Sequence, residues 1–174
     1  MTTQNLTVPE PSLVVLIGPS GAGKSTFAAK HFLPTEIVSS DFCRALVSDD
    51  ENNMAATPAA FRMLQSIAGE RLQSRRLTVI DATSVDPDSR RPLIALARKH
   101  GSLPVAIVFD VPEEVCVERN RGRAVRHLSA RIVHRQWDEM HLSMRNLNEE
   151  GFHQVHILDS VAAVDSAVVV RQPV

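Results

Sequence analysis

The sequence has little of what marks an extracellular, membrane-embedded or strongly basic protein. It holds two cysteines, Cys43 and Cys116, in no CxxC pattern, which favours a reducing compartment and argues against a thiolate metal site. No apolar run approaches the roughly 18 residues that a membrane-spanning helix needs, and the first residues lack a basic stretch followed by an apolar one. The net charge of -1 excludes a global basic field. We therefore expect a soluble, cytoplasmic protein in which any nucleic-acid footprint is local.

The chain alternates between short apolar runs and longer helical patterns. Its 174 residues are expected to form one domain, residues 1–174, with enough apolar material for a core. The runs are continuous and rich in β-branched residues, as strands buried on both faces are. This alternation predicts an α/β fold with a parallel sheet of four to five strands flanked by helices. The expected strands are 12–18, 36–40, 77–81, 103–110 and 154–158, the expected helices are 24–31, 58–75, 87–100, 112–120 and about 129–145, and the tail from residue 161 fits either type.

The stretch GPSGAGKST, residues 18–26, lies between the first strand and the first helix. It satisfies the phosphate-loop pattern G-x-x-x-x-G-K-[ST] in the strand–loop–helix context that the pattern requires. The glycines let backbone N–H groups approach the phosphates of a nucleotide, and the helix points its positive end at the same anion. Lys24 is expected to reach the β and γ oxygens, and Ser25 to offer its hydroxyl to Mg²⁺. The ATP-binding residues expected from this loop are Gly18, Ser20, Gly21, Gly23, Lys24, Ser25 and Thr26.

Signatures of other phosphate-loop classes are missing from the sequence. It contains no N-K-x-D, which a small GTPase uses to read guanine, and no LSGGQ-like segment of a transporter ATPase. The strand ending at Asp81 is followed by Ala82, where a motor ATPase has an acidic pair. These absences leave kinases, which place a second substrate opposite the nucleotide.

The segment SSDFCR, residues 39–44, ends the second expected strand and supplies candidate acceptor residues. Ligands of open α/β sheets gather at the carboxyl ends of strands, so Asp41 is expected beside the phosphate loop, where it accepts a proton from the attacking hydroxyl. Arg44 lies on the same helical face and suits a phosphate flanking that hydroxyl. The structural alternative is that Asp41 caps a helix and Arg44 lies on the surface. Phe42 is expected in the core, with the border of the acceptor cleft as the alternative.

Asp81 is the competing carboxylate at a strand end. It is a candidate ligand of Mg²⁺ through water, as strand-end acids often are in this fold. Alternatively it orients Ser25 or Thr83. We assign it the supporting role.

The segment 118–135 gathers arginines opposed only by Glu118 and forms the local basic patch that the net charge hides. Gly122 is expected to interrupt the helix and to hinge a lid that delivers arginines to the migrating phosphoryl group. Arg119 and Arg123 are one turn apart and are expected to bind ATP together, Arg119 also in catalysis. The alternative is a solvated helical face. Individually, Arg121, Arg131 and Arg135 are expected on the surface, and Arg126 completes the cluster.

Taken together, LVVLIGPSGAGKSTFAAKHF, SSDFCRALVSDDEN, LTVIDATS and VCVERNRGR resemble the kinase module of bacterial polynucleotide kinase-phosphatase, an RNA-repair family of P-loop phosphotransferases. The resemblance implies transfer of the ATP γ-phosphate to the 5′-hydroxyl end of RNA or DNA with Mg²⁺, with other nucleoside triphosphates as alternative donors. It implies that Asp41 is the general base, that Arg44 holds the phosphate 3′ of the terminal nucleoside, and that Arg119 and Arg123 are lid arginines.

The same resemblance implies a wider context for the chain. In the family this module precedes a phosphatase and a ligase-like domain, whose signatures are absent here, so the chain would be the N-terminal kinase module of a longer enzyme. An RNA-repair methyltransferase is the implied partner. Two other hypotheses stay open: a small-molecule kinase for a sugar or nucleoside, and a nucleotide-gated RNA-binding module without turnover.

Overall fold

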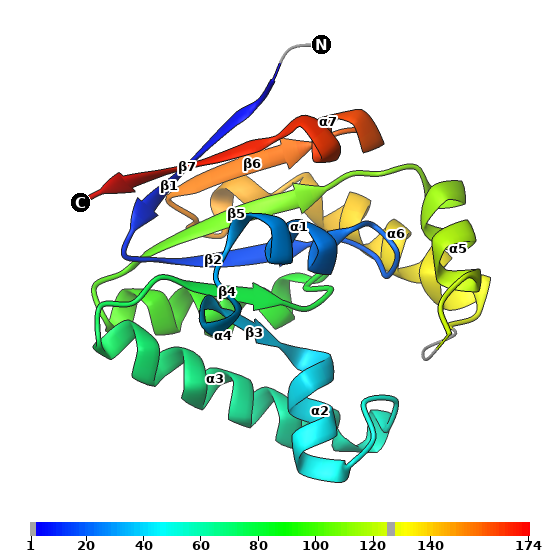
Figure 1. Cartoon of the computed structure of the whole chain (residues 1–174), viewed down its shortest axis with the longest axis horizontal. Coiled ribbons are helices and arrows are strands. Elements are labelled where there is room, and N and C mark those ends of the chain that lie inside the picture. Colours follow the sequence, from blue (N-terminus) through cyan, green and yellow to red (C-terminus); the bar gives the residue numbers. More distant parts are fainter. Residues whose placement is uncertain (1–2, 125–127) are drawn as a thin grey trace.

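The centre of the molecule is a parallel sheet of five strands in the order β3-β4-β2-β5-β6 (Figure 1). A computed structural model describes residues 3–124 and 128–174 of the chain. β2 lies in the middle of the sheet, paired with β4 on one side and β5 on the other. The predicted α/β fold with a parallel sheet is therefore confirmed. The strands are β2 (Ser12–Ile17), β3 (Ile37–Ser39), β4 (Thr78–Asp81), β5 (Leu103–Phe109) and β6 (Gln154–Leu158).

Helices cover both faces of this sheet, and β2 shows why. Val14 and Leu16 pack in a buried cluster with Phe27 of α1, whereas Leu13 packs in a second buried cluster with Leu64 of α3. Alternate side chains of a strand point to opposite faces, so a strand that is apolar throughout needs a cover on each side. The helices are α1 (Lys24–His31), α2 (Ser40–Ser48), α3 (Thr57–Gln73), α4 (Pro87–Lys99), α5 (Glu113–Arg121), α6 (Ala130–Met144) and α7 (Val161–Ser166), with short 3₁₀ turns at Pro34–Glu36, Met54–Ala56 and Leu147–Glu149.

A second sheet of two parallel strands joins the two ends of the described chain and was not expected from the sequence. β1 (Asn5–Glu10) pairs with β7 (Val168–Pro173) along its whole length. The tail from residue 161 is therefore both helix and strand, because α7 precedes β7. Arg171 of β7 reaches Glu36 with two short bonds of 2.8 and 2.6 Å, just before β3 begins. The second sheet thus braces the segment that leads into β3.

The end of β3 differs from the prediction by one residue, and α2 was not among the expected helices. The strand expected to run through residue 40 ends at Ser39, and α2 begins at Ser40. Ser39 is the N-cap, because its hydroxyl accepts a hydrogen bond from the backbone N–H of Phe42. The alternative that Asp41 caps the helix is therefore wrong, and Asp41 lies in the first turn instead.

None of the helices in residues 3–124 and 128–174 combines the length and the apolar character needed to cross a membrane.

Candidate active site

The P-loop connects β2 to α1, as the sequence predicts, and its shape depends on two glycines. Gly21 and Gly23 have φ angles of +85° and +98°, a region that side chains other than glycine rarely adopt. A Cβ atom on Gly21 would lie 2.4 Å from the carbonyl oxygen of Cys116. Gly23 is the N-cap of α1 and has no side chain to cap the helix. The first N–H groups of α1 are thus presented at the loop, where an anion binds favourably.

Lys24 is the buried cation of this loop. Its side chain is only 7% exposed, and its Nζ donates to the carbonyl oxygens of Gly18 at 2.8 Å and Pro19 at 2.9 Å. Burial lowers the pKa of Lys24 from 10.5 to about 8, although the nearby carboxylate of Asp81 acts in the opposite direction. The ammonium group therefore remains charged at neutral pH and is held at the base of the loop.

Ser25 and Asp81 meet at the carboxyl end of β4. The Ser25 hydroxyl donates to Asp81 Oδ2 at 2.7 Å, which is the contact expected if Asp81 orients Ser25. Asp81 is 9% exposed and lies opposite Ser39 in the register of β3 and β4. A hydroxyl and a carboxylate are the hard oxygen ligands that Mg²⁺ prefers, so this pair has the chemistry to hold that ion, with Asp81 acting through water.

Asp41 and Arg44 form an ion pair within the first turns of α2. Arg44 Nη2 donates to Asp41 Oδ1, and Arg44 Nε donates to the carbonyl oxygen of Glu51 at 2.9 Å. The prediction that the two residues share a helical face is confirmed. Arg44 is 4% exposed, so the alternative that it lies on the surface is wrong. Phe42, between them in sequence, is 61% exposed, so its expected place in the core is also wrong.

These residues converge on one cavity of about 240 Å³, which we call the α2-side cavity. The P-loop, the ends of β3 and β4, and the first turns of α2 all contribute lining residues. The residue proposed as proton acceptor therefore lies in the same cavity as the residue proposed to hold the terminal phosphates. The lining of this cavity includes the side chains of Lys24, Ser25, Asp41, Arg44, Asp81 and Gln136, together with Ser20 of the P-loop.

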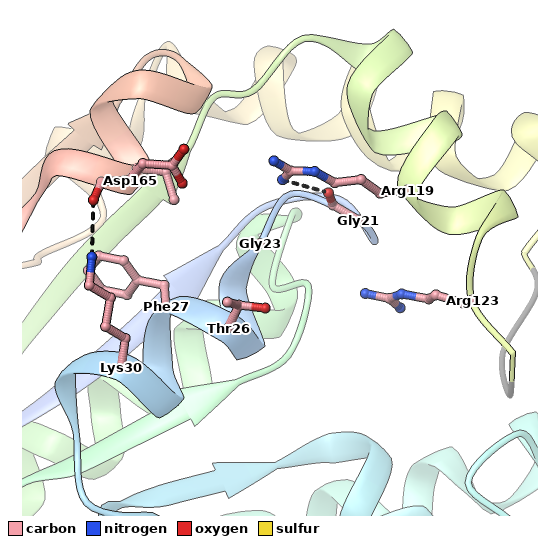
Figure 2. A pocket seen from close by; sticks show the side chains of 9 residues that line it. Gly21, Gly23, Thr26, Phe27, Lys30, Arg119, Arg123 and Asp165 are labelled. Carbon is pink, nitrogen blue, oxygen red and sulfur yellow. Dashed lines mark hydrogen bonds between the residues drawn. The ribbon is translucent and has the colours of Figure 1, made fainter.

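A second cavity, of about 360 Å³, lies on the other side of the P-loop, and we call it the α7-side cavity. Figure 2 shows Arg119 and Arg123 approaching it from α5 and the segment after α5, opposite Thr26 of α1. The carboxylate of Asp165 on α7 lies at its far side (Figure 2). The predicted P-loop residues Gly21, Gly23 and Thr26 line this cavity.

The two predicted lid arginines both reach the P-loop. Arg119 Nη1 donates to the carbonyl oxygen of Gly21 at 3.4 Å, and Arg123 Nη1 donates to the Ser20 hydroxyl at 3.1 Å. Arg123 lines both cavities, so it lies between them. Gly122 ends α5, as expected of an interruption.

Three other arginines of the segment 118–135 lie on the surface. Arg121, Arg131 and Arg135 are exposed, as expected. Arg121 pairs with Glu118 at 3.8 Å and Arg135 with Glu139 at 4.0 Å, which are contacts of a solvated helical face. Arg126 lies outside the described residues.

One residue of the α2-side cavity has no sequence signal that would single it out. Gln136 of α6 accepts a hydrogen bond of 2.9 Å from the backbone N–H of Ser20, across a separation of 116 residues in sequence. A lone glutamine in a polar helix belongs to no motif, so only the folded chain reveals the contact.

Among curated proteins, the chain is similar to a transcription factor and to a nucleotide kinase. It is 28% identical over 162 residues to transcription factor bHLH140 of Arabidopsis thaliana, covering 90% of this chain but 17% of that protein. It is 28% identical over 145 residues to adenylate kinase of Coxiella burnetii, covering 74% of this chain and 60% of that protein. The chain therefore spans less than two thirds of either relative.

Among solved structures, the chain is similar to a protein of the Pnkp1/Rnl/Hen1 RNA repair complex, with a TM-score of 0.69 and 22% identity over 80% of this chain and 47% of that one. At that identity the likeness concerns the fold, which is that of P-loop kinases. A family model described as an AAA domain matches residues 13–147, which include the P-loop, Asp41, Arg44 and the arginines of α5. The chain therefore belongs to this AAA-domain family, AAA_33, and has the fold of P-loop kinases.

Proposed function

We propose that this chain is an ATP-dependent polynucleotide 5′-hydroxyl kinase that acts in the healing of RNA or DNA ends. The observation that carries the proposal is the α2-side cavity, in which Asp41 and Arg44 face the P-loop residues Lys24 and Ser25. A nucleotide held by the P-loop presents its terminal phosphoryl group to this cavity, and an acceptor hydroxyl enters from the side of α2. The similarity to the RNA repair complex supports the choice of a nucleic-acid acceptor.

On the donor side, the N–H groups of the loop and Lys24 bind the β- and γ-phosphates of ATP. Ser25 and Asp81 are the residues that would hold Mg²⁺, which neutralises charge on the phosphate oxygens when bound. The guanidinium groups of Arg119 and Arg123, which already lie at the loop, stabilise the charge that spreads over the migrating phosphoryl group.

On the acceptor side, Asp41 accepts the proton of the 5′-hydroxyl. The hydroxyl oxygen forms the new bond to the γ-phosphorus, the bond from that phosphorus to the β–γ bridging oxygen breaks, and ADP leaves. Arg44 orients the Asp41 carboxylate through their ion pair. Within the described residues, two of the five N–H groups of Arg44 donate to Asp41 and to the Glu51 carbonyl. Other N–H groups of the same fork bind the phosphate 3′ of the acceptor nucleoside.

The wider setting follows from the same proposal. The chain acts as the kinase module of a longer end-healing enzyme, beside phosphatase and ligase-like domains and with an RNA-repair methyltransferase as partner. The supporting observation is that the chain covers 47% of the similar protein in the Pnkp1/Rnl/Hen1 complex.

A small-molecule kinase is the second candidate. The adenylate kinase of Coxiella burnetii is 28% identical over 74% of this chain, and a cavity of about 240 Å³ also suits an acceptor of nucleoside size. A panel of acceptors separates the two candidates, since they share the same P-loop and the same base.

The deciding experiment incubates the chain with γ-labelled ATP, Mg²⁺ and 5′-hydroxyl oligonucleotides of RNA and DNA. The panel adds a nucleoside 3′-phosphate, adenylate, free sugars and a 5′-phosphorylated oligonucleotide as the blocked control. We expect label on the 5′-hydroxyl oligonucleotides and on the nucleoside 3′-phosphate, and none on free sugars or the blocked oligonucleotide. Transfer to adenylate or a sugar alone, by a folded protein, would make the second candidate right.

The role of Asp41 is tested in the same assay. Asp41→Asn should lower kcat by roughly 10²-fold or more, as the loss of a general base does. Asp88→Asn, on the exposed surface of α4, is the matched control and should leave the rate unchanged. An Asp41→Asn variant with wild-type turnover would remove the proposed base.

A further inference from the structure

Gln136 contacts the P-loop in a way that sets the orientation of its amide. The backbone N–H of Ser20 points at the Gln136 side chain, with 2.9 Å between the nitrogen and Oε1. A backbone N–H is a donor only, so the atom that faces it must be the amide oxygen. The amide nitrogen Nε2, with two N–H donors, is therefore on the other branch of the side chain.

The side chain of Gln136 lines the α2-side cavity together with Lys24 and Asp41. Within the described residues, Nε2 has no hydrogen-bond partner, although Oε1 has one. A primary amide that lines a cavity donates its N–H groups when a charged acceptor binds there, because a hydrogen bond to a charged group is stronger than one between neutral groups. The acceptors expected in this cavity are the oxygens of the terminal phosphoryl group.

The position of Gln136 is held by its neighbours on α6. Met140 is fully buried, and Trp137 Nε1 donates to the carbonyl oxygen of Val111 at 3.2 Å. Further along the helix, His141 Nε2 lies 2.7 Å from Asp110 Oδ1. These contacts fix α6 against the end of β5, so Gln136 is presented from an anchored helix, which suits a residue that must place a donor accurately.

Ser20 is contacted both by the segment that follows α5 and by α6. Its N–H is bonded to Gln136, and its hydroxyl accepts from Arg123 at 3.1 Å. The cationic donor and the neutral amide donor thus approach the same edge of the P-loop. Both side chains also line the α2-side cavity.

We propose that Gln136 binds the γ-phosphoryl group of the donor nucleotide through Nε2 while Oε1 holds the Ser20 N–H, so that it distinguishes a nucleoside triphosphate from a diphosphate. The inference deepens the proposed function and rests on it for the identity of the donor site. It does not depend on the acceptor, because it concerns a phosphoryl group before transfer. Its failure is therefore distinguishable from a failure of the polynucleotide assignment.

The test uses Gln136→Glu, which has nearly the same shape. A carboxylate still accepts the Ser20 N–H but has no N–H to donate, and it repels the phosphoryl oxygens. The dissociation constants of a non-hydrolysable ATP analogue and of ADP are measured with Mg²⁺ for wild type and variant. We expect the analogue to bind about 10- to 100-fold more weakly and ADP to change by less than about threefold.

Gln73→Glu at the exposed end of α3 adds the same charge away from the cavities and is the matched control, expected to change neither constant. Gln136→Met, which removes both the N–H donors and the acceptor of the Ser20 N–H at similar volume, is the second variant should Gln136→Glu not fold. Loss of the loop contact weakens both nucleotides in this variant, and the analogue is expected to lose at least about tenfold more affinity than ADP. Equal weakening of both nucleotides would mean that Gln136 only supports the loop, and no weakening would mean that it contacts neither. Either result overturns the proposal.

Discussion

The α7-side and α2-side cavities flank the same P-loop but are built from different groups. On the α7 side the loop contributes the backbone of Gly21 and Gly23, and Arg119 reaches it through the Gly21 carbonyl. On the α2 side the functional groups are side chains bonded to one another, such as Asp41 with Arg44 and Ser25 with Asp81. Backbone recognition of an anion tolerates changes of side chain, whereas recognition by paired side chains does not.

This difference has a consequence for substrate choice. A phosphate site built from the loop backbone does not contact the acceptor, so the same donor site can serve different acceptors. The acceptor is then selected by a few side chains in the first turns of α2, which follow β3. Variants on the two sides should therefore fail in different ways, those of the donor side with every acceptor and those of the acceptor side with some.

The largest effect is expected from Lys24→Met. The Lys24 side chain lines the α2-side cavity but serves the phosphates of the donor. Loss of a buried ammonium aimed at the phosphates should lower kcat/KM by about 10³-fold for every acceptor. Because burial lowers the pKa of Lys24, the charged form is disfavoured in the folded protein, so the variant should melt no lower than wild type. Rates and melting curves check both statements, with Lys99→Met on α4 as control. An effect confined to one acceptor would contradict the division into two sides.

The next largest effect is expected from Arg44→Ala on the acceptor side. The KM for a nucleoside 3′-phosphate or an oligonucleotide should rise about 10- to 100-fold, since a charge-assisted hydrogen bond to phosphate is lost. A nucleoside without the phosphate should be affected far less. Steady-state kinetics with the two acceptors check this, with Arg91→Ala on the surface of α4 as control. An equal loss with both acceptors would assign Arg44 to holding Asp41 alone.

The strand, loop and helix around the P-loop are the part of the site whose local structure the sequence predicted. The P-loop pattern is local, because the strand, the glycines and the helix N-terminus are contiguous, and the structure has the expected strand, loop and helix. Continuous β-branched runs likewise predicted all five strands of the central sheet. The contact between Ser25 and Asp81 could be expected as an alternative from the sequence, because Ser25 lies at the start of α1 and Asp81 at the end of β4.

The parts that escaped prediction depend on contacts between distant segments. The pairing of β1 with β7 joins the two ends of the chain, and neither strand is a long apolar run. The bond from Ser20 to Gln136 crosses 116 residues and involves no motif. The choice of Ser39 over Asp41 as N-cap depends on where β3 ends, and both residue types are good caps. Phe42 was misplaced because an apolar side chain beside a functional carboxylate is expected to be buried.

A smaller effect on the donor side is expected from pH. Nucleotide binding requires the charged form of Lys24, whose pKa is about 8 in the free protein. Between pH 8 and pH 9 the charged fraction falls about fivefold, so the dissociation constant for ATP should rise about fivefold over that unit. The phosphates titrate at lower pH and do not contribute. Titrations at several pH values check this, and Lys24→Arg, which stays charged, should remove the dependence whatever its affinity.

The smallest effect is expected from Phe42→Ala. This variant tests whether the acceptor contacts the protein outside the α2-side cavity. Phe42 and Leu46 are 61% and 53% exposed and lie one turn apart on α2, directly after Asp41. An exposed aromatic ring offers a stacking surface to an unpaired base, and partial stacking is worth about 1 kcal/mol at most in such a position.

The KM for a single-stranded oligonucleotide should therefore rise about threefold to fivefold in Phe42→Ala. The KM for a nucleoside 3′-phosphate, which has no second base, should not change. Leu142→Ala, on an equally exposed apolar position of α6, is the control and should change neither. A rise for both acceptors would place the terminal nucleoside itself on Phe42. No rise for either would confine the acceptor to the α2-side cavity, and the distinction between a polynucleotide and a small molecule would then rest on Arg44 alone.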